Sequence, residues 1–279
     1  AIEIVECAIE KHGAPIYVRH EVVHNKFVVS NLKKKGAIFV EEIDEVPKGG
    51  VVIFSAHGVS QAIRKQTSEI TNIIYDATCP LVTKVHKEVN RRQKQNHQVI
   101  LIGHAGHPEV EGTLGQSNES NHINLIESIN DVEGLELSED LDISYTTQTT
   151  LSVDDTKLIV NSLKTKFPKI QEPKKSDICY ATQNRQDSVK VMIKNSEMLL
   201  VIGSKNSSNS NRLKEIAEKS GKPAYLIDGS ADIKNEWLSG IDSIGVTAGA
   251  SAPEILVQAV VSYLMMNGGS EVVEVSGTK

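Results

Sequence analysis

The stretch IIYDATCPLVTKV, residues 73–85, leads from a short apolar run through an aspartate and a cysteine into a helical pattern. A second stretch, SDICYATQNRQ at 176–186, has the same order, with one residue instead of two between its aspartate and its cysteine. After Cys79 and after Cys179, the next apolar strand follows at nearly the same distance. The two cysteines therefore mark the beginnings of two copies of one structural unit.

The repeat extends beyond the cysteines. Three stretches share a short apolar strand, an acid, a turn and an acid–apolar pair: FVEEIDEV (39–46), LIESINDV (125–132) and LIDGSADI (226–233). An apolar strand with a polar loop precedes each stretch, and another follows it. Short apolar runs that end in Gly, Ser, His or Asn are typical of buried parallel strands, and the segments between them keep helical spacing. The sequence therefore predicts α/β layers with parallel sheets.

We expect three α/β units, 1–78, 79–178 and 179–279, to form a trefoil with pseudo-threefold symmetry around a central site. Each unit should begin with a cysteine, continue with a helix and then supply three strand–loop segments. The first helix pattern, AIEIVECAIEKHG, starts at Ala1, so the leading cysteine of the first unit is expected a few residues upstream, in a front segment that this chain lacks. Cys7 has no counterpart in the other units, and we expect it to be a buried, inert thiol.

Composition narrows the class of protein. The 279 residues are 39% hydrophobic and 24% charged, which suits a soluble chain with a sizeable core. The formal net charge of −6 argues against a general nucleic-acid binder. No apolar run reaches the roughly 18–20 residues that span a bilayer. Three cysteines without a secretory signal favour a reducing cytoplasm over a disulfide framework.

Cys79 and Cys179 have two interpretations. They could be small core residues at strand ends, or ligands in a thiolate cage for a soft metal centre. Their recurrence at one place in the repeat favours the cage. Structural zinc usually takes closely spaced cysteine pairs and four ligands, which this sequence lacks. Three thiolates would instead hold an iron–sulfur cluster and leave one iron open to substrate.

A zinc hydrolase is a weaker alternative. Its candidate ligands are His20, His24, His104 and His107. The segment HEVVH, residues 20–24, has histidines at suitable spacing but lacks the glutamate beside the second histidine, and it follows a predicted strand instead of lying on a helix.

The loops after the predicted strands supply hydrogen-bond donors suited to an anion. The candidate residues are His24, His57, His107, Ser207, Ser208, Asn209 and Ser251. Glycine-rich backbone and helices expected to begin near Asn211 and Pro253 add amide groups and positive dipole ends, which suits phosphate or diphosphate. Each of these residues alone could be an ordinary turn or cap residue. No nucleotide P-loop or dinucleotide-binding glycine motif is present.

Glu109, in HPEVEG, lies in one of these loops beside His107. If burial raises its pKa, it could donate a proton; otherwise it is a first-turn carboxylate facing a helix dipole. Thr149 and Thr150 could orient that acid or a substrate hydroxyl. As a purely local alternative, Thr150 or Ser152 caps the helix that follows.

Taken together, these motifs resemble the LytB/IspH family over essentially the whole chain. The segments that carry the resemblance are YVRHEVVHN, FSAHGVSQA, DATCPLVTKVH, IGHAGHPEVEGT, TQTTLSVDDT, DICYATQNRQ, VIGSKNSSNSNRL and GVTAGASAPEILV. The family fold is a trefoil of three α/β units around a central cluster, as the repeat predicts.

The resemblance implies an iron–sulfur oxidoreductase, with a 4Fe–4S cluster in which one iron has no protein ligand. It implies reductive dehydroxylation of (E)-4-hydroxy-3-methylbut-2-enyl diphosphate to isopentenyl and dimethylallyl diphosphates, the last step of the non-mevalonate isoprenoid pathway. Flavodoxin or ferredoxin is the implied electron donor; we expect neither nucleic acid nor membrane as a partner. A non-catalytic phosphate-binding or diphosphate-binding module with idle thiols is the alternative.

The resemblance also assigns roles to individual residues. It implies Cys79 and Cys179 as cluster ligands, Glu109 as proton donor and Thr149 as its relay and contact to the substrate hydroxyl. It implies diphosphate contacts for His24, His57, His107, Ser207, Ser208, Asn209 and Ser251. The third ligand of the family lies in an RGFCAGV-like segment, which we expect before Ala1, and VVEVSGTK stops short of the family's usual C-terminal tail. Without that third cysteine, the chain is expected to hold a cluster poorly or not at all, which puts its activity in doubt.

Overall fold

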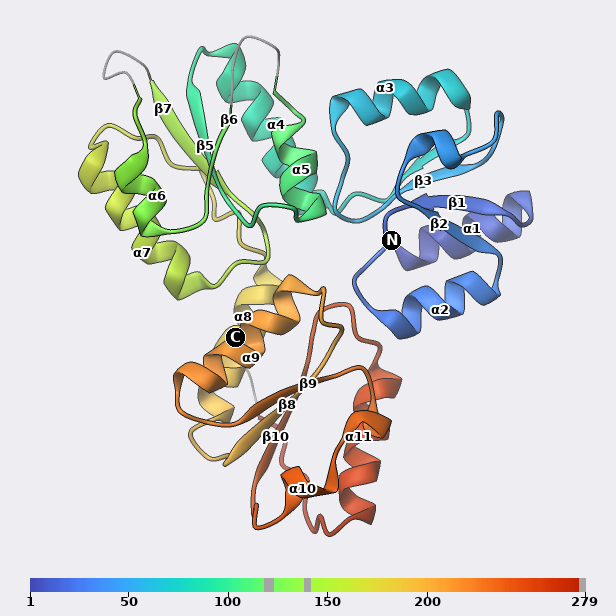
Figure 1. Ribbon diagram of the computed structural model, residues 1–279, viewed down its shortest axis with the longest axis vertical. Helices are drawn as coiled ribbons and strands as arrows, with labels where there is room; N and C mark the ends of the chain where they lie inside the picture. The colour runs from blue at the N-terminus through green and yellow to red at the C-terminus, as the bar shows by residue number, and fades with distance from the viewer. Residues whose placement is uncertain (118–122, 138–141, 276–279) are drawn as a thin grey trace. The chain divides into compact units, whose positions relative to one another are not determined.

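The computed structural model describes residues 1–117, 123–137 and 142–275. Within these residues it contains three separate β-sheets, and every strand pairing in them is parallel (Figure 1). Helices alternate with the strands along the chain. The α/β class with parallel sheets, predicted from the alternation of apolar runs and helical patterns, is confirmed.

The three sheets have the same strand order. In each, the first strand of the unit lies in the centre, the second on one side and the third on the other. The strands of the first sheet are β1 (Ile16–Arg19), β2 (Ala37–Val40), β3 (Val52–Phe54) and β4 (Ile74–Asp76). Those of the second are β5 (Gln98–Ile102), β6 (Ile123–Ile126) and β7 (Ile143–Thr147). Those of the third are β8 (Met198–Ile202), β9 (Ala224–Ile227) and β10 (Ile244–Ala248).

The described helices fall at matching places in the three units. Those preceding the central strands are α1 (Ile2–His12), α4 (Pro80–Lys94) and α8 (Tyr180–Met192). Those following the central strands are α2 (Lys26–Lys34), α5 (Pro108–Leu114) and α9 (Ser208–Lys219). Short helices after the second strands are η1 (Ile43–Glu45), α6 (Ile129–Gly134), η2 (Ser230–Asp232) and α10 (Asn235–Leu238). Those following the third strands are α3 (Gln61–Ile70), α7 (Val153–Lys166) and α11 (Glu254–Met266).

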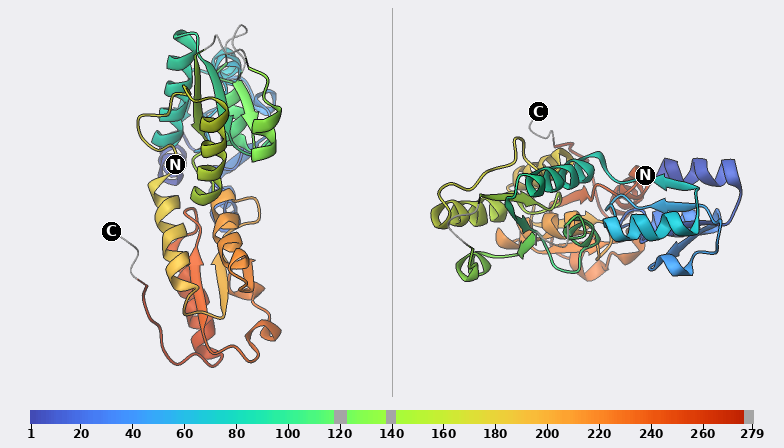
Figure 2. Two further views of the ribbon diagram at one scale, coloured as in Figure 1. Left: turned by 90° about the vertical axis from the view of Figure 1, so that its left-hand side faces the viewer. Right: turned by 90° about the horizontal axis from the view of Figure 1, so that it is seen from above.

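Helices cover both faces of the third sheet, which explains why its central strand, β8, is apolar throughout. In the third sheet, Leu199 and Val201 pack with α8 and α9, whereas Leu200 and Ile202 pack towards α11. The left view of Figure 2 shows α8 (yellow) and α9 (orange) running beside these strands. Side chains alternate between the faces of a strand, so a strand buried on both faces is usually apolar at successive positions, as β8 is. This is the pattern from which the sheets were predicted. β7 is buried along its whole length too, but it also carries Ser144, Thr146 and Thr147.

The repeated acidic stretches form the same hydrogen bond in each unit. The backbone N–H of Glu41 donates to the carboxylate of Glu45 at 2.9 Å, and that of Glu127 donates to Asp131 at 2.8 Å. In the third unit, Asp228 donates to Asp232 at 2.8 Å. Each acid four residues on thus closes the turn between the second strand and the helical segment after it. The repeat seen in the sequence is therefore a repeat of geometry.

The segment before each cysteine pairs with the preceding sheet. β4 pairs with β3 at the edge of the first sheet and leads to Cys79. Ahead of Cys179, Gln171 forms an isolated parallel bridge with Ser144 of β7 at the edge of the second sheet. The chain thus leaves each sheet at its carboxyl-terminal edge and reaches a cysteine before the next helix begins.

Backbone contacts group the chain into two compact units, Ala1–Val23 with Asn31–Cys179, and His24–Ser30 with Tyr180–Lys279. The division into 1–78, 79–178 and 179–279 stays a prediction, although each sheet lies within one of these ranges. Among the described residues, no helix has both the length and the apolar character needed to cross a membrane.

The expectation for Cys7 was wrong, because its thiol is exposed. Helix α1 buries the face that carries Val5 and Ala8, at 0% and 2% exposure. Cys7 lies two residues from Val5 and hence on another face of the helix. The lack of a matching cysteine in the other units correctly set Cys7 apart, but it did not indicate burial.

Candidate active site

Both cysteines of the repeat occupy the same structural position. The backbone N–H of Cys79 donates to the carbonyl of Ala56 at 2.9 Å, and that of Cys179 donates to Thr149 at 2.8 Å. Ala56 and Thr149 are each two residues beyond the end of a strand, β3 and β7 respectively. Cys79 is the N-cap of α4, and Cys179 directly precedes α8. Each partly exposed thiol therefore lies at the positive end of a helix, which favours an anionic ligand there.

The loops beside these cysteines bring two predicted histidines together. His57 follows β3, and His107 is the N-cap of α5, after β5. Their rings meet edge to face with centroids 5.7 Å apart. The N–H of Glu109 donates to Nδ1 of His107 at 3.1 Å, so the neutral His107 ring carries its proton on Nε2. Nδ1 of His57 lies 3.3 Å from Oγ of Ser55.

Glu109 is buried in the first turn of α5, at 3% exposure. One carboxylate oxygen accepts the backbone N–H of Thr149 at 2.6 Å, and the other accepts the Thr149 hydroxyl at 2.9 Å. Glu109 is thus a first-turn carboxylate, as the local alternative predicted, and also a buried acid, as the role of proton donor requires. Thr149 binds the carboxylate of Glu109 in this way, and the carbonyl of Thr149 also accepts the backbone N–H of Cys179.

Burial raises the pKa of Glu109 to about 7, because the charged form loses its hydration. The two hydrogen bonds from Thr149 act in the opposite direction, since they stabilise the carboxylate, and the nearby charge of Asp177 adds to the rise. Burial has the larger effect, so the net shift of the Glu109 pKa is upward. A carboxyl group with a pKa near 7 can hold a proton at neutral pH and release it, as general acid catalysis requires.

The remaining predicted residues lie in the second compact unit. Ser207 is the N-cap of α9, and Ser208 and Asn209 form its first turn. Nδ1 of His24 lies 3.2 Å from the side-chain nitrogen of Asn206, and the carbonyl of His24 accepts the hydroxyl of Ser251 at 2.9 Å. The structure thus brings these five predicted residues into one unit: His24, Ser207, Ser208, Asn209 and Ser251.

Helix α9 begins at Ser208, earlier than the start predicted near Asn211. The cause is the side chain of Ser207, which accepts the backbone N–H of Ser210 and so starts the helix. Helix α11 begins at Glu254, next to the predicted Pro253. Ser152, rather than Thr150, caps α7 through the N–H of Asp155, as one of the local alternatives proposed.

Asn209 is the strongest sign of a ligand in this unit. Its side chain is 4% exposed, and neither its amide oxygen nor its amide nitrogen has a hydrogen-bond partner within the part of the chain that the structure describes. An unpaired buried amide is costly, so a polar ligand at this position would restore what folding leaves unsatisfied.

The loops around Asn209 approach so closely that they require glycine. A Cβ added to Gly249 would lie 2.1 Å from Oγ of Ser210, and one added to Gly203 would lie 2.2 Å from the same atom. Oγ of Ser210 in turn lies 3.0 Å from Oγ of Ser207. Ser210, which the sequence motifs did not single out, therefore packs the loops after β8 and β10 against the start of α9.

Other supporting residues were also missed, among them Ser55, Asn206, Lys84 and Asp177. The sequence did carry a signal for Asp177, because an aspartate precedes both Cys79 and Cys179. Ser55 and Asn206 could not be found by pattern, since only the folded loops place them beside His57 and His24.

The geometry gives no support to the zinc hydrolase. Within the described ranges, no three His, Cys, Asp or Glu side chains gather as they would around a metal ion. Nδ1 of His20 bonds with Glu41 at 2.7 Å, and Nδ1 of His104 bonds with Glu127 at 3.2 Å. Both histidines are instead paired with the first acid of a repeated stretch.

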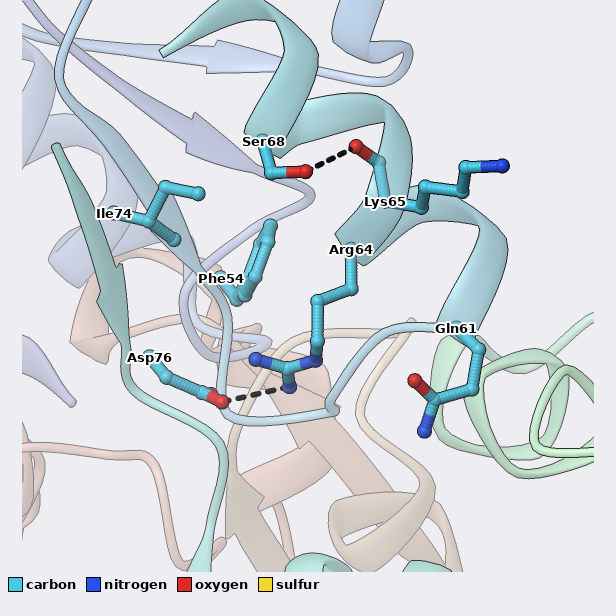
Figure 3. Close-up of a pocket in the computed structure, with 7 residues that line it drawn as sticks. All are labelled: Phe54, Gln61, Arg64, Lys65, Ser68, Ile74 and Asp76. Carbon is cyan, nitrogen blue, oxygen red and sulfur yellow. Dashed lines mark hydrogen bonds and ion pairs between the residues drawn. The ribbon is translucent and has the colours of Figure 1, made fainter. Parts of the chain in front are cut away.

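A cavity of about 450 Å³ opens elsewhere in the first compact unit, between α3 and the strands β3 and β4 (Figure 3). Arg64 points across it to Asp76, with which it forms an ion pair at 2.7 Å. Its lining includes none of the predicted site residues. Asp76 also accepts the N–H of Thr78 at 3.1 Å, so one wall of the cavity supports the segment that leads to Cys79.

Comparison with known proteins decides the family. The model of the LytB protein family matches residues 1–265, which is most of the chain. The chain belongs to the LytB family.

Relatives in this family are similar over nearly their whole length. A protein of Vesicomyosocius okutanii is 68% identical over 279 residues, which is 100% of this chain and 91% of the relative. One from Pseudomonas aeruginosa is 58% identical, over 99% of this chain and 89% of the relative. Both are named 4-hydroxy-3-methylbut-2-enyl diphosphate reductase.

Two solved structures agree with the fold. The E-1-hydroxy-2-methyl-but-2-enyl-4-diphosphate reductase from Plasmodium falciparum matches with a TM-score of 0.92 and 40% identity, over 95% of this chain and 82% of that one. A structure titled (E)-4-hydroxy-3-methyl-but-2-enyl diphosphate reductase matches with a TM-score of 0.67 and 28% identity, over 95% and 93%.

The raised pKa of Glu109 predicts a pH-dependent stability. Its carboxyl group holds a proton more tightly in the folded chain than in the unfolded chain, whose ordinary value is 4.5. Stability should therefore fall as pH rises from 4.5 to about 7, by about 3 kcal/mol from this group. Glu109→Gln should remove that slope in denaturant unfolding measured across this pH range. Thr149→Val should move the Glu109 carboxyl titration, followed by infrared spectroscopy, to higher pH. An unchanged slope in Glu109→Gln would contradict the assignment.

Proposed function

We propose that this chain, together with a segment that supplies the third cluster cysteine, reduces (E)-4-hydroxy-3-methylbut-2-enyl diphosphate to isopentenyl and dimethylallyl diphosphates, as the last step of the non-mevalonate isoprenoid pathway. The names of its relatives support this activity. The observation that carries it is the buried Glu109, with a pKa of about 7, held by the residue whose carbonyl binds Cys179. Glu109, an acid that can hold a proton near neutral pH, is thus connected through Thr149 to Cys179, a cysteine of the repeat.

A 4Fe–4S cluster fits the two cysteines. Both thiols are free and partly exposed, and each precedes a helix, where an anionic ligand is favoured. Thiolates are the usual ligands of such clusters. We propose that the third thiolate comes from a segment before Ala1, where the repeat places the cysteine of the first unit. When bound, the cluster would supply the electrons and leave one iron without a protein ligand.

The reaction uses two electrons and two protons, breaks the C–O bond and releases water. We assign the proton for the departing hydroxyl to the carboxyl of Glu109. Thr149, whose hydroxyl bonds Glu109 at 2.9 Å, would orient that acid and contact the substrate hydroxyl. The new C–H bond can form at either end of the allylic unit, which accounts for two products. We propose flavodoxin or ferredoxin as the electron donor and the cytoplasm as the compartment.

The diphosphate contacts are assigned to the predicted loop residues, His24, His57, His107, Ser207, Ser208, Asn209 and Ser251. Serine hydroxyls, an amide and backbone N–H groups at the start of α9 can bind an anion without a cluster of basic side chains. The buried, unsatisfied amide of Asn209 supports this assignment most strongly.

Turnover distinguishes the reductase from a non-catalytic diphosphate-binding module. We expect the chain, preceded by a cysteine-bearing segment and reconstituted anaerobically with iron and sulfide, to form both products from the substrate when a chemical reductant is supplied. Glu109→Gln should keep the iron content and lose at least about 100-fold in kcat, because general acid catalysis contributes about 10²- to 10⁴-fold. Binding of substrate without turnover in the reconstituted protein would favour the module.

Asn209 provides a test of the diphosphate site that needs no cluster. Asn209→Ala should weaken the binding of inorganic diphosphate, measured by calorimetry, about 10- to 100-fold, because hydrogen bonds to charged groups contribute about 1.5–3 kcal/mol. Ser220→Ala, at the other end of α9, is the matched control and should bind as the unaltered chain does. Equal affinities in all three proteins would remove Asn209 from the site.

A further inference from the structure

Lys84 joins the two segments that carry the cysteines. It lies on α4, the helix that Cys79 begins. Its ammonium group donates to the carbonyls of Lys175 and Ser176 at 2.7 and 3.1 Å, and to Oδ1 of Asp177 at 2.8 Å. Asp177 is two residues before Cys179. A single side chain thus ties the helix headed by one cysteine to the segment that ends at the other.

The carboxylate of Asp177 is enclosed and held on both oxygens. Its side chain is 0% exposed, whereas that of Lys84 is 33% exposed. Oδ2 accepts the hydroxyl of Thr146 at 2.8 Å and the N–H of Thr147 at 3.1 Å, both at the end of β7. A buried charge is strongly destabilising once its partner is removed, so the position of this ion pair is tightly specified. Asp177 therefore connects α4, the end of β7 and the Cys179 segment.

A second anchor keeps α4 in register with the same segment. Arg92, at 7% exposure near the other end of α4, bonds with the side chain of Gln171 and donates to the carbonyl of Glu172 at 3.1 Å. The helix and the segment are thus fixed together at two points about two turns apart. The remaining freedom at the cysteine end is limited by Lys84.

The aspartate before the other cysteine does not play this part. Asp76 pairs with Arg64 of α3, and the two side chains are 40% and 44% exposed. Helix α3 carries neither cysteine. Only Lys84 and Asp177, of these two pairs, connect both cysteine-bearing segments.

We propose that Lys84 and Asp177 are positioning residues that set the spacing between Cys79 and Cys179, and through it the hold on the cluster. The second part rests on the proposed function, whereas the spacing itself does not. Three acceptors converge on one ammonium group, a geometry that a planar guanidinium does not reproduce. Lys84→Arg should therefore fail to restore the spacing although it keeps the charge.

Spin labels on Cys79 and Cys179 test the spacing directly. The labels are placed in a Cys7→Ser background, because Cys7 is a third thiol and is exposed. Pulsed electron–electron double resonance then gives the distribution of distances between the two labels. Lys84→Met and the double variant Lys84→Met/Asp177→Asn should broaden or shift the distribution. The double variant removes both charges and so avoids an orphaned carboxylate. Lys87→Met, an exposed lysine on the same helix, should leave it unchanged.

A second measurement connects the spacing to the cluster. In reconstituted protein that retains Cys7, Cys79 and Cys179 and is preceded by a cysteine-bearing segment, the rate of iron loss to a chelator should rise about 10- to 100-fold in the Lys84 variants, as for other groups that support metal ligands, and not in Lys87→Met. Distance distributions in the Lys84 variants as narrow as in Lys87→Met would overturn the positioning role. If no form of the protein takes up iron, the proposed function fails, while the distance distributions still decide the positioning.

Discussion

The hydrogen bond from each cysteine amide to the loop beside it is the constraint on which the site depends. Cys79 is bound to the carbonyl of Ala56, and Cys179 to that of Thr149. Because the carboxyl ends of parallel strands share one edge of a sheet, these bonds bring each thiol to the edge where the polar loops begin. His57 is the next residue after Ala56, and Thr149 itself holds Glu109. The same few backbone contacts therefore fix the positions of the two cysteines, of His57 and of Glu109.

Glu109 shows how opposing effects are combined at such an edge. Burial favours its neutral form, and Thr149 donates two hydrogen bonds that favour its charged form. The result is a carboxyl group poised near neutral pH rather than one permanently protonated or ionised. The carbonyl of the same threonine accepts the backbone N–H of Cys179, so the environment of the acid and the position of a proposed cluster ligand are linked.

Much of this arrangement could be predicted from sequence because it repeats. The three acidic stretches predicted three equivalent turns, and the apolar strands predicted parallel sheets; both are present in the structure. Features without a counterpart were harder. The exposure of Cys7 depends on which face α1 buries, and the pairing of His57 with His107 depends on how the loops of two different sheets meet. Local pattern carries no information on the pairing of the histidines, whereas the apolar spacing of Val5 and Ala8 could have shown that Cys7 lies on another face of α1.

The most direct test of the account asks which cysteines the cluster occupies. The chain, preceded by a cysteine-bearing segment, would be reconstituted anaerobically with iron and sulfide and alkylated in parallel with the same protein left untreated. Mass spectrometry would measure the modification of each cysteine. We expect reconstitution to protect Cys79 and Cys179 and to leave the exposed Cys7 fully reactive as the internal reference. Iron uptake with Cys79 and Cys179 alkylated as readily as Cys7 would contradict it.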